Sequence, residues 1–159
     1  SVCDGGFRNI LLFNSHGGNQ GIGQVILEDF GAANPDCRIA MVTWWTLAQD
    51  ALAELSKAGR FGTGHACEFE TSLMMAAGAI EPNIDLPTGE FFVPSHGWAD
   101  SSMLHKSVGA LYRSIRQISG GSGVIGRPDA ATLEQGHKIT MAVVRRLETV
   151  VTDLRQMGQ

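Results

Sequence analysis

The stretch NILLFNSHGGNQG, residues 9–21, decides how this sequence is interpreted. NILLF is short, continuous and apolar, which is typical of a β-strand covered on both faces. It runs into a turn rich in glycine and asparagine, and then into residues 22–34, which have the apolar spacing of a helix. The turn therefore places His16 at the carboxyl end of a strand, which is where open parallel sheets bind ligands.

The next segments repeat this alternation. CRIAMVTWW, residues 37–45, is predicted to be a second buried strand. TLAQDALAELSKAG, residues 46–59, is predicted to be an amphipathic helix with Thr46 as its N-cap and Gly59 just past its end. Strand, helix, strand and helix in this order predict a parallel sheet, and the length of 159 residues predicts a single α/β domain over residues 1–159.

The second half of the sequence is less regular. A polar loop over residues 60–71 leads into a short helix, SLMMAAGA, over residues 72–79. Residues 81–102 are predicted to form a long irregular excursion with a brief strand at EFFVP, and residues 107–119 fit a helix or a strand. From about Ala130 the apolar residues follow a helical period to the end of the sequence. Two confident strands are fewer than a doubly wound sheet contains, so strands at the amino end are expected to be missing.

Composition limits the function. Apolar residues make up 43%, charged residues 18%, and the formal net charge is −4, as in a soluble globular protein without the basic patch that nucleic acid requires. No apolar run reaches the ~20 residues that span a bilayer. The start lacks the features of a secretion signal. The three cysteines are widely spaced, which predicts reduced thiols in a cytoplasmic protein.

Three residues are candidates for a metal centre. His16 is either a metal ligand or a residue that caps the next helix, since neutral imidazole does both. His65 and Glu70 stand five apart, so they converge only if His65 precedes the first helical turn. The alternatives are a capping or core role for His65 and a solvated helix position for Glu70. Glu68 is explained as a first-turn acid favoured by the helix dipole.

The other candidates are weaker. Trp44 and Trp45 end the second predicted strand, where either one can line a pocket or pack in the core. Cys67 is either a third ligand or a small buried apolar residue. His96 is open between a ligand or proton carrier and a plain loop residue, and His105 and His137 are expected to be structural.

The ordered set of motifs is more specific than any one of them. NSHGGNQG, GHACEFETS and GVIGRPDAATLEQG, residues 123–136, resemble the creatininase family of metal-dependent creatinine amidohydrolases, whose pattern is roughly NGHGGN, HAGxxETS and GxxGDPxxAT. The resemblance implies a three-layer α/β/α fold with a mostly parallel sheet. It also implies one or two divalent ions, usually zinc, with manganese or iron as alternatives, and hydrolysis of compact C–N bonds such as cyclic or formyl amides.

By motif, the resemblance implies that His16 and Glu70 are metal ligands and that His65 is catalytic and moves a proton. Trp45, or else Trp44, is implied to bind substrate. Gly17, Gly18 and Asn19 are expected to admit the substrate to the ion and to orient it.

The sequence departs from the family pattern in three ways. Ser15 and Cys67 each replace a glycine, and Arg127 replaces the usual aspartate, which puts any role of that acid in doubt. The segment ExHG and the following aspartate, which supply the remaining ligands in the family, are missing, so the sequence resembles the second half of the family fold. A catalytic zinc site usually has three protein ligands, whereas the motifs of this sequence supply two, His16 and Glu70.

The leading hypothesis is therefore a subunit or fragment of a metal-dependent amidohydrolase with a small-molecule substrate. A companion chain would supply the other ligands and strands, in a homo- or hetero-oligomer. The alternatives are a catalytically silent structural or regulatory subunit, and a lyase or isomerase that uses the same metal site.

Overall fold

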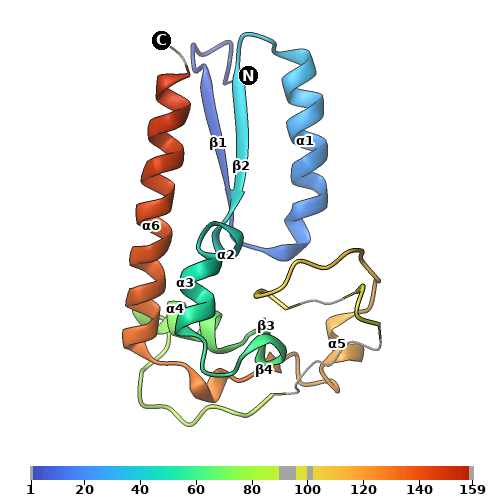
Figure 1. Ribbon diagram of the computed structural model, residues 1–159, viewed down its shortest axis with the longest axis vertical. Coiled ribbons are helices and arrows are strands. Elements are labelled where there is room, and N and C mark those ends of the chain that lie inside the picture. The colour runs from blue at the N-terminus through green and yellow to red at the C-terminus, as the bar shows by residue number, and fades with distance from the viewer. Residues whose placement is uncertain (1, 90–95, 100–101, 158–159) are drawn as a thin grey trace. The chain divides into compact units, whose positions relative to one another are not determined.

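The computed structural model describes residues 2–89, 96–99 and 102–157 (Figure 1). The elements are, in chain order, β1 (Asn9–Asn14), the 3₁₀-helix η1 (Gly17–Asn19), α1 (Gln20–Ala33), β2 (Arg38–Thr43), α2 (Trp44–Leu47), α3 (Gln49–Leu55), η2 (Arg60–Gly62), β3 (Thr63–His65), α4 (Glu68–Ala76), α5 (Ile115–Ile118), β4 (Ile125–Gly126), η3 (Pro128–Ala130) and α6 (Leu133–Gln156). They form two compact units, one of residues 1–47 with 143–159 and the other of residues 48–142.

The first unit is built on a parallel strand pair, as the alternation of strand and helix predicts. β1 pairs with β2 in register from Asn9 opposite Arg38 to Asn14 opposite Thr43. α1 connects the two strands and packs against β2, and Figure 1 shows the helix running beside the pair. The approach is close at the buried Gly23, where an added Cβ would lie 2.1 Å from Sδ of Met41. The helical crossover and the parallel pairing are confirmed.

The two strands are less buried than their sequences predict. β1 is half-buried along most of its length, and Phe13 is 46% exposed. On α1, Ile22 and Val25 are 57% and 56% exposed, although they belong to the predicted apolar face. The prediction of strands covered on both faces is wrong for the described residues. A continuous apolar strand is typical of a sheet that is covered on both faces. Within the described residues this sheet has only two strands, so much of its apolar surface is left exposed.

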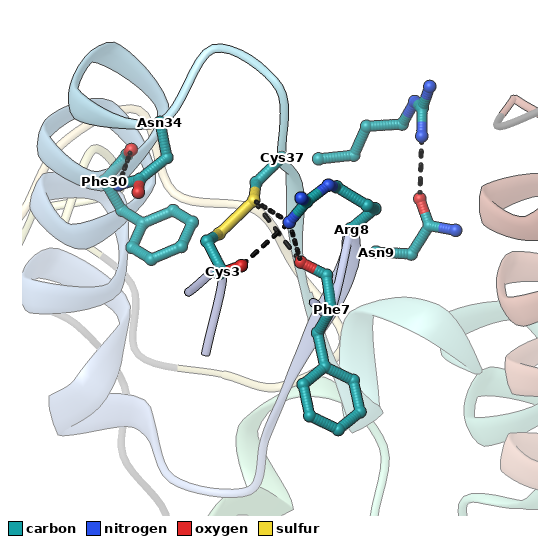
Figure 2. Close-up of a disulfide and its surroundings, with 8 residues drawn as sticks. Cys3, Phe7, Arg8, Asn9, Phe30, Asn34 and Cys37 are labelled. Atoms are coloured by element: carbon teal, nitrogen blue, oxygen red, sulfur yellow. Dashed lines mark hydrogen bonds between the residues drawn. A yellow bond between two sulfur atoms is a disulfide. The ribbon is translucent and has the colours of Figure 1, made fainter. Parts of the chain in front are cut away.

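A disulfide joins the turn before β1 to the residue immediately before β2 (Figure 2). Cys3 and Cys37 are 6.6 Å apart between Cα atoms, both are at most 9% exposed, and Nη1 of Arg8 donates to the carbonyl of Cys3 at 2.8 Å. The prediction of three reduced thiols is therefore wrong for two of them. The parallel register brings Cys37 beside the residues that precede β1, which spacing in the sequence does not reveal. Reduced thiols consequently no longer support a cytoplasmic location.

The second unit contains a small antiparallel ladder and the first turns of α6. β3 pairs with β4, with Thr63 opposite Gly126 and His65 opposite Ile125. Gly126 has φ +119°, and an added Cβ would lie 2.1 Å from the carbonyl oxygen of Gly62, so this position requires glycine. The strands of the described residues thus form two sheets of two strands each, one parallel and one antiparallel. The α/β class is confirmed. The completely buried apolar side chains of the second unit include Leu52, Cys67, Phe69 and Ile139.

Several boundaries differ from the predictions. Trp44 and Trp45 begin α2 instead of ending a strand, and the helix predicted over residues 46–59 is broken at Ala48 and ends at Leu55. Thr46 lies inside α2, so it is not an N-cap. Of residues 107–119, only Ile115–Ile118 is regular, a helical turn that begins with a capping box. The strand proposed at EFFVP lies outside the described residues, and the long C-terminal helix is confirmed as α6.

Candidate functional site

The first half of the candidate site is the turn that follows β1. Asn14 is 6% exposed, and its Nδ2 donates to Oγ1 of Thr43 at 3.1 Å, which ties the carboxyl ends of β1 and β2 together. Oδ1 of Asn14 accepts from the backbone N–H of His16 at 3.1 Å. The His16 ring turns back over η1, and its Nδ1 accepts from the N–H of Gly18 at 3.1 Å. The helix-capping alternative for His16 therefore describes its hydrogen bonding.

This cap restricts what the imidazole of His16 can do. A neutral imidazole has one protonated and one unprotonated ring nitrogen, so with Nδ1 accepting, Nε2 carries the proton. A metal ion binds imidazole only through a lone pair. A cation at His16 therefore displaces the bond from Gly18 on either route: it takes the lone pair of Nδ1, or it binds Nε2 after the proton has moved to Nδ1, which then can no longer accept.

The glycines and the tryptophans also meet in this unit. An added Cβ on Gly17 would lie 3.9 Å from Cη2 of Trp45, so the indole borders the turn. The rings of Trp44 and Trp45 meet edge to face with centroids 5.7 Å apart. Trp44 is 6% exposed and belongs to the core, whereas Trp45 is half-buried. Of the two predicted pocket residues, Trp45 is the one with surface beside the histidine turn.

The second half of the candidate site is the turn between β3 and α4. His65 is the last residue of β3, so it precedes the first turn of α4. Its side chain is half-buried. Ala66 follows with φ +50°, a left-handed conformation that is uncommon for alanine and frequent at functional sites. This conformation directs the N–H of Ala66 to Oε2 of Glu70, which accepts at 2.5 Å. The structure thus places His65 and Glu70 on one tight turn, with Ala66 held between them.

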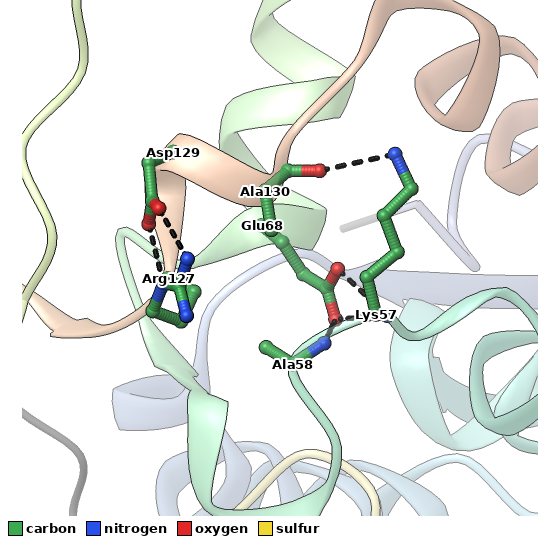
Figure 3. Close-up of polar contacts among 6 residues, drawn as sticks. All are labelled: Lys57, Ala58, Glu68, Arg127, Asp129 and Ala130. Atoms are coloured by element: carbon green, nitrogen blue, oxygen red, sulfur yellow. Dashed lines mark hydrogen bonds and ion pairs between the residues drawn. The ribbon is translucent and has the colours of Figure 1, made fainter.

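Glu68 has a role that the sequence analysis missed (Figure 3). It is completely buried, and it does not lie on the helix surface as a dipole-favoured acid. Its carboxylate accepts from Oγ of Ser56 at 2.6 Å and from the backbone N–H groups of Lys57 and Ala58 at 3.0 to 3.2 Å. The carboxylate therefore fixes the chain that follows α3. A sequence signal for this role is weak, because an acid in a first helical turn is usually explained by the dipole.

Cys67 is the N-cap residue of α4 and is completely buried. Burial raises the pKa of its thiol, against the opposing effect of the backbone N–H groups of Phe69 and Glu70. The complete burial of Cys67 agrees with the alternative of a small buried apolar residue.

His96, His105 and Arg127 each have a partner of their own. The ring of His96 stacks on that of Trp98 with centroids 5.8 Å apart, and Nδ1 of His105 lies 3.2 Å from Nη2 of Arg60. Arg127, which stands where the family pattern has aspartate, instead forms a two-pronged ion pair with the carboxylate of Asp129. This pair lowers the pKa of Asp129.

His16 belongs to the first unit, whereas His65 and Glu70 belong to the second. The candidate residues therefore form two separate groups, one in each unit. Within residues 2–89, 96–99 and 102–157, no three side chains of His, Cys, Asp or Glu are grouped so that they could hold a metal ion.

Comparison with known proteins decides the family. A family model described as "Creatininase: Creatinine amidohydrolase" matches residues 1–151. This chain belongs to the creatininase family. The match includes all three motifs that carry the resemblance, and with them His16, His65 and Glu70. No curated protein matches the sequence significantly.

Two solved creatininase structures share the fold. A mutant creatininase of the Zn–Zn type superposes with a TM-score of 0.65 at 19% sequence identity, over 96% of this chain and 58% of that one. A mutant creatininase complexed with creatine gives 0.64 at 19% identity, over 99% of this chain and 60% of that one. This creatininase-family chain therefore spans about three fifths of the length of the solved proteins that it matches. Across its described residues, it has no helix of the length and apolar character needed to cross a membrane.

The donor chemistry of the creatininase-family residues fits a divalent ion in part. The carboxylate of Glu70 has two oxygens, so accepting one bond from Ala66 leaves lone pairs for a cation. The imidazole of His16 fits only if Nδ1 gives up its bond to Gly18, whichever ring nitrogen binds the ion.

Proposed function

We propose that this chain is part of a metal-dependent amidohydrolase that cleaves a C–N bond, other than a peptide bond, in a small cyclic amide or formamide. Membership of the creatininase family over residues 1–151 is the observation that carries this proposal, because the matched segment contains all three residues of the proposed centre. His16 and Glu70 are the metal ligands, and His65 is the proton carrier. The ion is zinc, with manganese or iron as alternatives, and one or two are held per site.

When bound, a divalent ion supplies Lewis-acid polarisation of a carbonyl and a water molecule with a pKa lowered to about 7. The residues of this chain do the rest. His65, half-buried at the end of β3, gives a proton to the departing nitrogen. Gly17 and Gly18 have no side chains to block a ligand at the turn, and Asn19 orients the substrate. Trp45, which borders Gly17, forms one wall, and Trp44 supports it from the core.

The proposed fold is one α/β/α domain over residues 1–159, with three layers and a mostly parallel sheet completed from outside this sequence. A companion chain contributes those strands and the remaining metal ligands in an oligomer. The exposed apolar residues of α1 support this, since Ile22, Val25 and Ile26 are each more than 40% exposed and follow the helical spacing of a face that is normally covered.

Metal content tests the proposal directly. The protein is isolated with any companion chain and its divalent metal is counted by mass spectrometry. We expect stoichiometric metal in the parent protein, and a loss of at least half of it in His16→Ala and in Glu70→Gln. His137→Ala and Glu148→Gln are matched controls on α6 and should keep their metal. An assembled parent protein that binds no stoichiometric divalent metal would refute the proposal. Hydrolysis of creatinine serves as the first activity probe.

A second candidate is a catalytically silent structural subunit of a creatininase-like complex. One observation favours it: the side chains of both proposed ligands already form local caps, His16 to Gly18 and Glu70 to Ala66. Titration of the assembled protein with zinc, followed by NMR, separates the candidates. If His16 binds the ion through Nδ1, the amide resonance of Gly18 moves at stoichiometric zinc. If the caps are purely structural, the amide resonances of Gly18 and Ala66 stay where they are and His16→Ala leaves the activity of the complex unchanged.

A further inference from the structure

A buried glutamine three residues beyond the part of the third motif that matches GxxGDPxxAT contacts the helix that carries Glu70. Gln135 lies in the first turn of α6 and is 3% exposed. Its Oε1 accepts from Oγ of Ser72 at 2.7 Å, and its Nε2 donates to the carbonyl of Leu55 at 2.9 Å and to Oε2 of Glu68 at 3.3 Å. One oxygen acceptor and two N–H donors are thus all used, so these partners fix the orientation of the amide.

The two contacts on α4 are spaced so that one side chain can span them. Glu68 and Ser72 are four residues apart, and residues at that spacing lie on the same face of a helix. Both are completely buried. Gln135 therefore bridges one full turn of α4 from outside, through a donor at one end and an acceptor at the other.

The packing around this bridge leaves little freedom. Oγ of Ser72 also accepts from the N–H of Thr132 at 3.0 Å. A Cβ added to Gly136 would lie 1.9 Å from the carbonyl oxygen of Ser72, so the backbones of α4 and α6 are in direct contact there. A buried polar network whose members are all satisfied is rigid, because any displacement leaves a buried donor or acceptor without its partner.

The bridged turn also carries Glu70, one residue of the candidate site. The carboxylate of Glu68 is turned into the network, whereas the carboxylate of Glu70 accepts from the N–H of Ala66. The hydroxyl of Thr71 lies 3.5 Å from the carbonyl of Ala66, so the first turn of α4 holds both backbone groups of that residue. A shift of this turn would therefore change the contact between Glu70 and Ala66, and with it the placement of His65.

We propose that Gln135 is a positioning residue for the candidate site, which fixes the first turn of α4 through Glu68 and Ser72 and so sets the Ala66–Glu70 contact. The role of this contact in catalysis rests on the proposed amidohydrolase function, whereas the hydrogen bond between Ala66 and Glu70 is part of the structure whatever the function is. The test below measures it without metal or substrate, so a failure of the metal proposal would leave the result intact.

The test compares Gln135→Glu with a control on the same helix. Gln135→Glu keeps the size of the side chain and its acceptor for Ser72, but it replaces the donor to Glu68 by a carboxylate oxygen beside a carboxylate. Ile139→Ala removes a completely buried apolar side chain four residues further along α6 and touches no hydrogen bond of the bridge. Amide hydrogen exchange is followed by NMR for Ala66, with Leu52 of α3 as the internal reference.

We expect the protection of Ala66 relative to Leu52 to fall about tenfold or more in Gln135→Glu, since a hydrogen bond to a charged group contributes about 1.5–3 kcal/mol. The same ratio should change less than twofold in Ile139→Ala, even though that variant is less stable overall. If Gln135→Glu does not fold, Ser72→Ala removes one bond of the bridge and should lower the ratio in the same direction. An unchanged ratio in a folded bridge variant, or an equal fall in Ile139→Ala, would overturn the proposal.

Discussion

Removing the Cys3–Cys37 disulfide should destabilise the first unit strongly. The bond spans 34 residues in sequence and encloses β1 and α1. The chain-entropy relation for a loop of this length gives a stabilisation of about 4 kcal/mol at 25 °C, because the cross-link restricts the unfolded chain. With a urea dependence of about 2 kcal/mol per molar, the unfolding midpoint should fall by about 2 M when the bond is reduced or when both cysteines are changed to serine.

The assay is urea unfolding followed by tryptophan fluorescence in a Trp98→Phe background. Trp44 and Trp45 then report on the first unit alone. Thiol counting in denaturant is the companion measurement: the disulfide-bonded chain exposes only the thiol of Cys67, whereas a fully reduced chain exposes three. A midpoint that moves by less than about 0.3 M on reduction would refute the entropic reasoning. Three reactive thiols in freshly isolated protein would refute the bond itself.

Three further predictions concern the second unit. Gly136→Ala should cost about 2 kcal/mol or more in urea unfolding, because the new methyl meets the backbone carbonyl of Ser72, and full stability would show that α4 and α6 do not touch there. Ala66→Gly should be neutral or stabilising by up to about 1 kcal/mol, whereas Ala66→Val should destabilise, since a β-branched residue tolerates a positive φ poorly. Arg127→Gln should raise the pKa of Asp129, measured by NMR titration. Because that pKa is lowered in the folded protein, the pair stabilises the fold above the ordinary carboxyl pKa, and this contribution is lost as pH falls through the lowered value.

Local patterns predicted the elements of the first unit well. The apolar run of β1, the helical spacing of α1 and the second apolar run each record a periodicity that the backbone must follow, so β1, α1 and β2 were predicted within a few residues. The same patterns failed to predict burial, as Phe13 and Ile22 show, because burial depends on which neighbours are present. The break at Ala48 was missed as well, because neither a glycine nor a proline marks it.

The candidate site was predictable in its residue types but not in its contacts. The motifs identified His16, His65 and Glu70, and the structure confirms that His65 precedes the helix that carries Glu70. The buried bonds of Glu68 and the bridge of Gln135 connect residues that are 10 to 67 positions apart in the sequence. A single sequence has no periodic signal for such long-range polar contacts.

Both halves of the candidate site use a ligand-type side chain as a cap, and the two caps differ in what they allow. Glu70 accepts from Ala66 through one oxygen, and because its second oxygen has lone pairs of its own, the cap and a cation are compatible. His16 accepts from Gly18 through Nδ1, and that lone pair serves either the amide or a cation, never both. The contact of Glu70 thus leaves room for a bond to an ion, whereas any ion at His16 would displace the bond from Gly18. If the amidohydrolase proposal is right, metal binding therefore rearranges the turn after β1 while leaving the turn before α4 as it is.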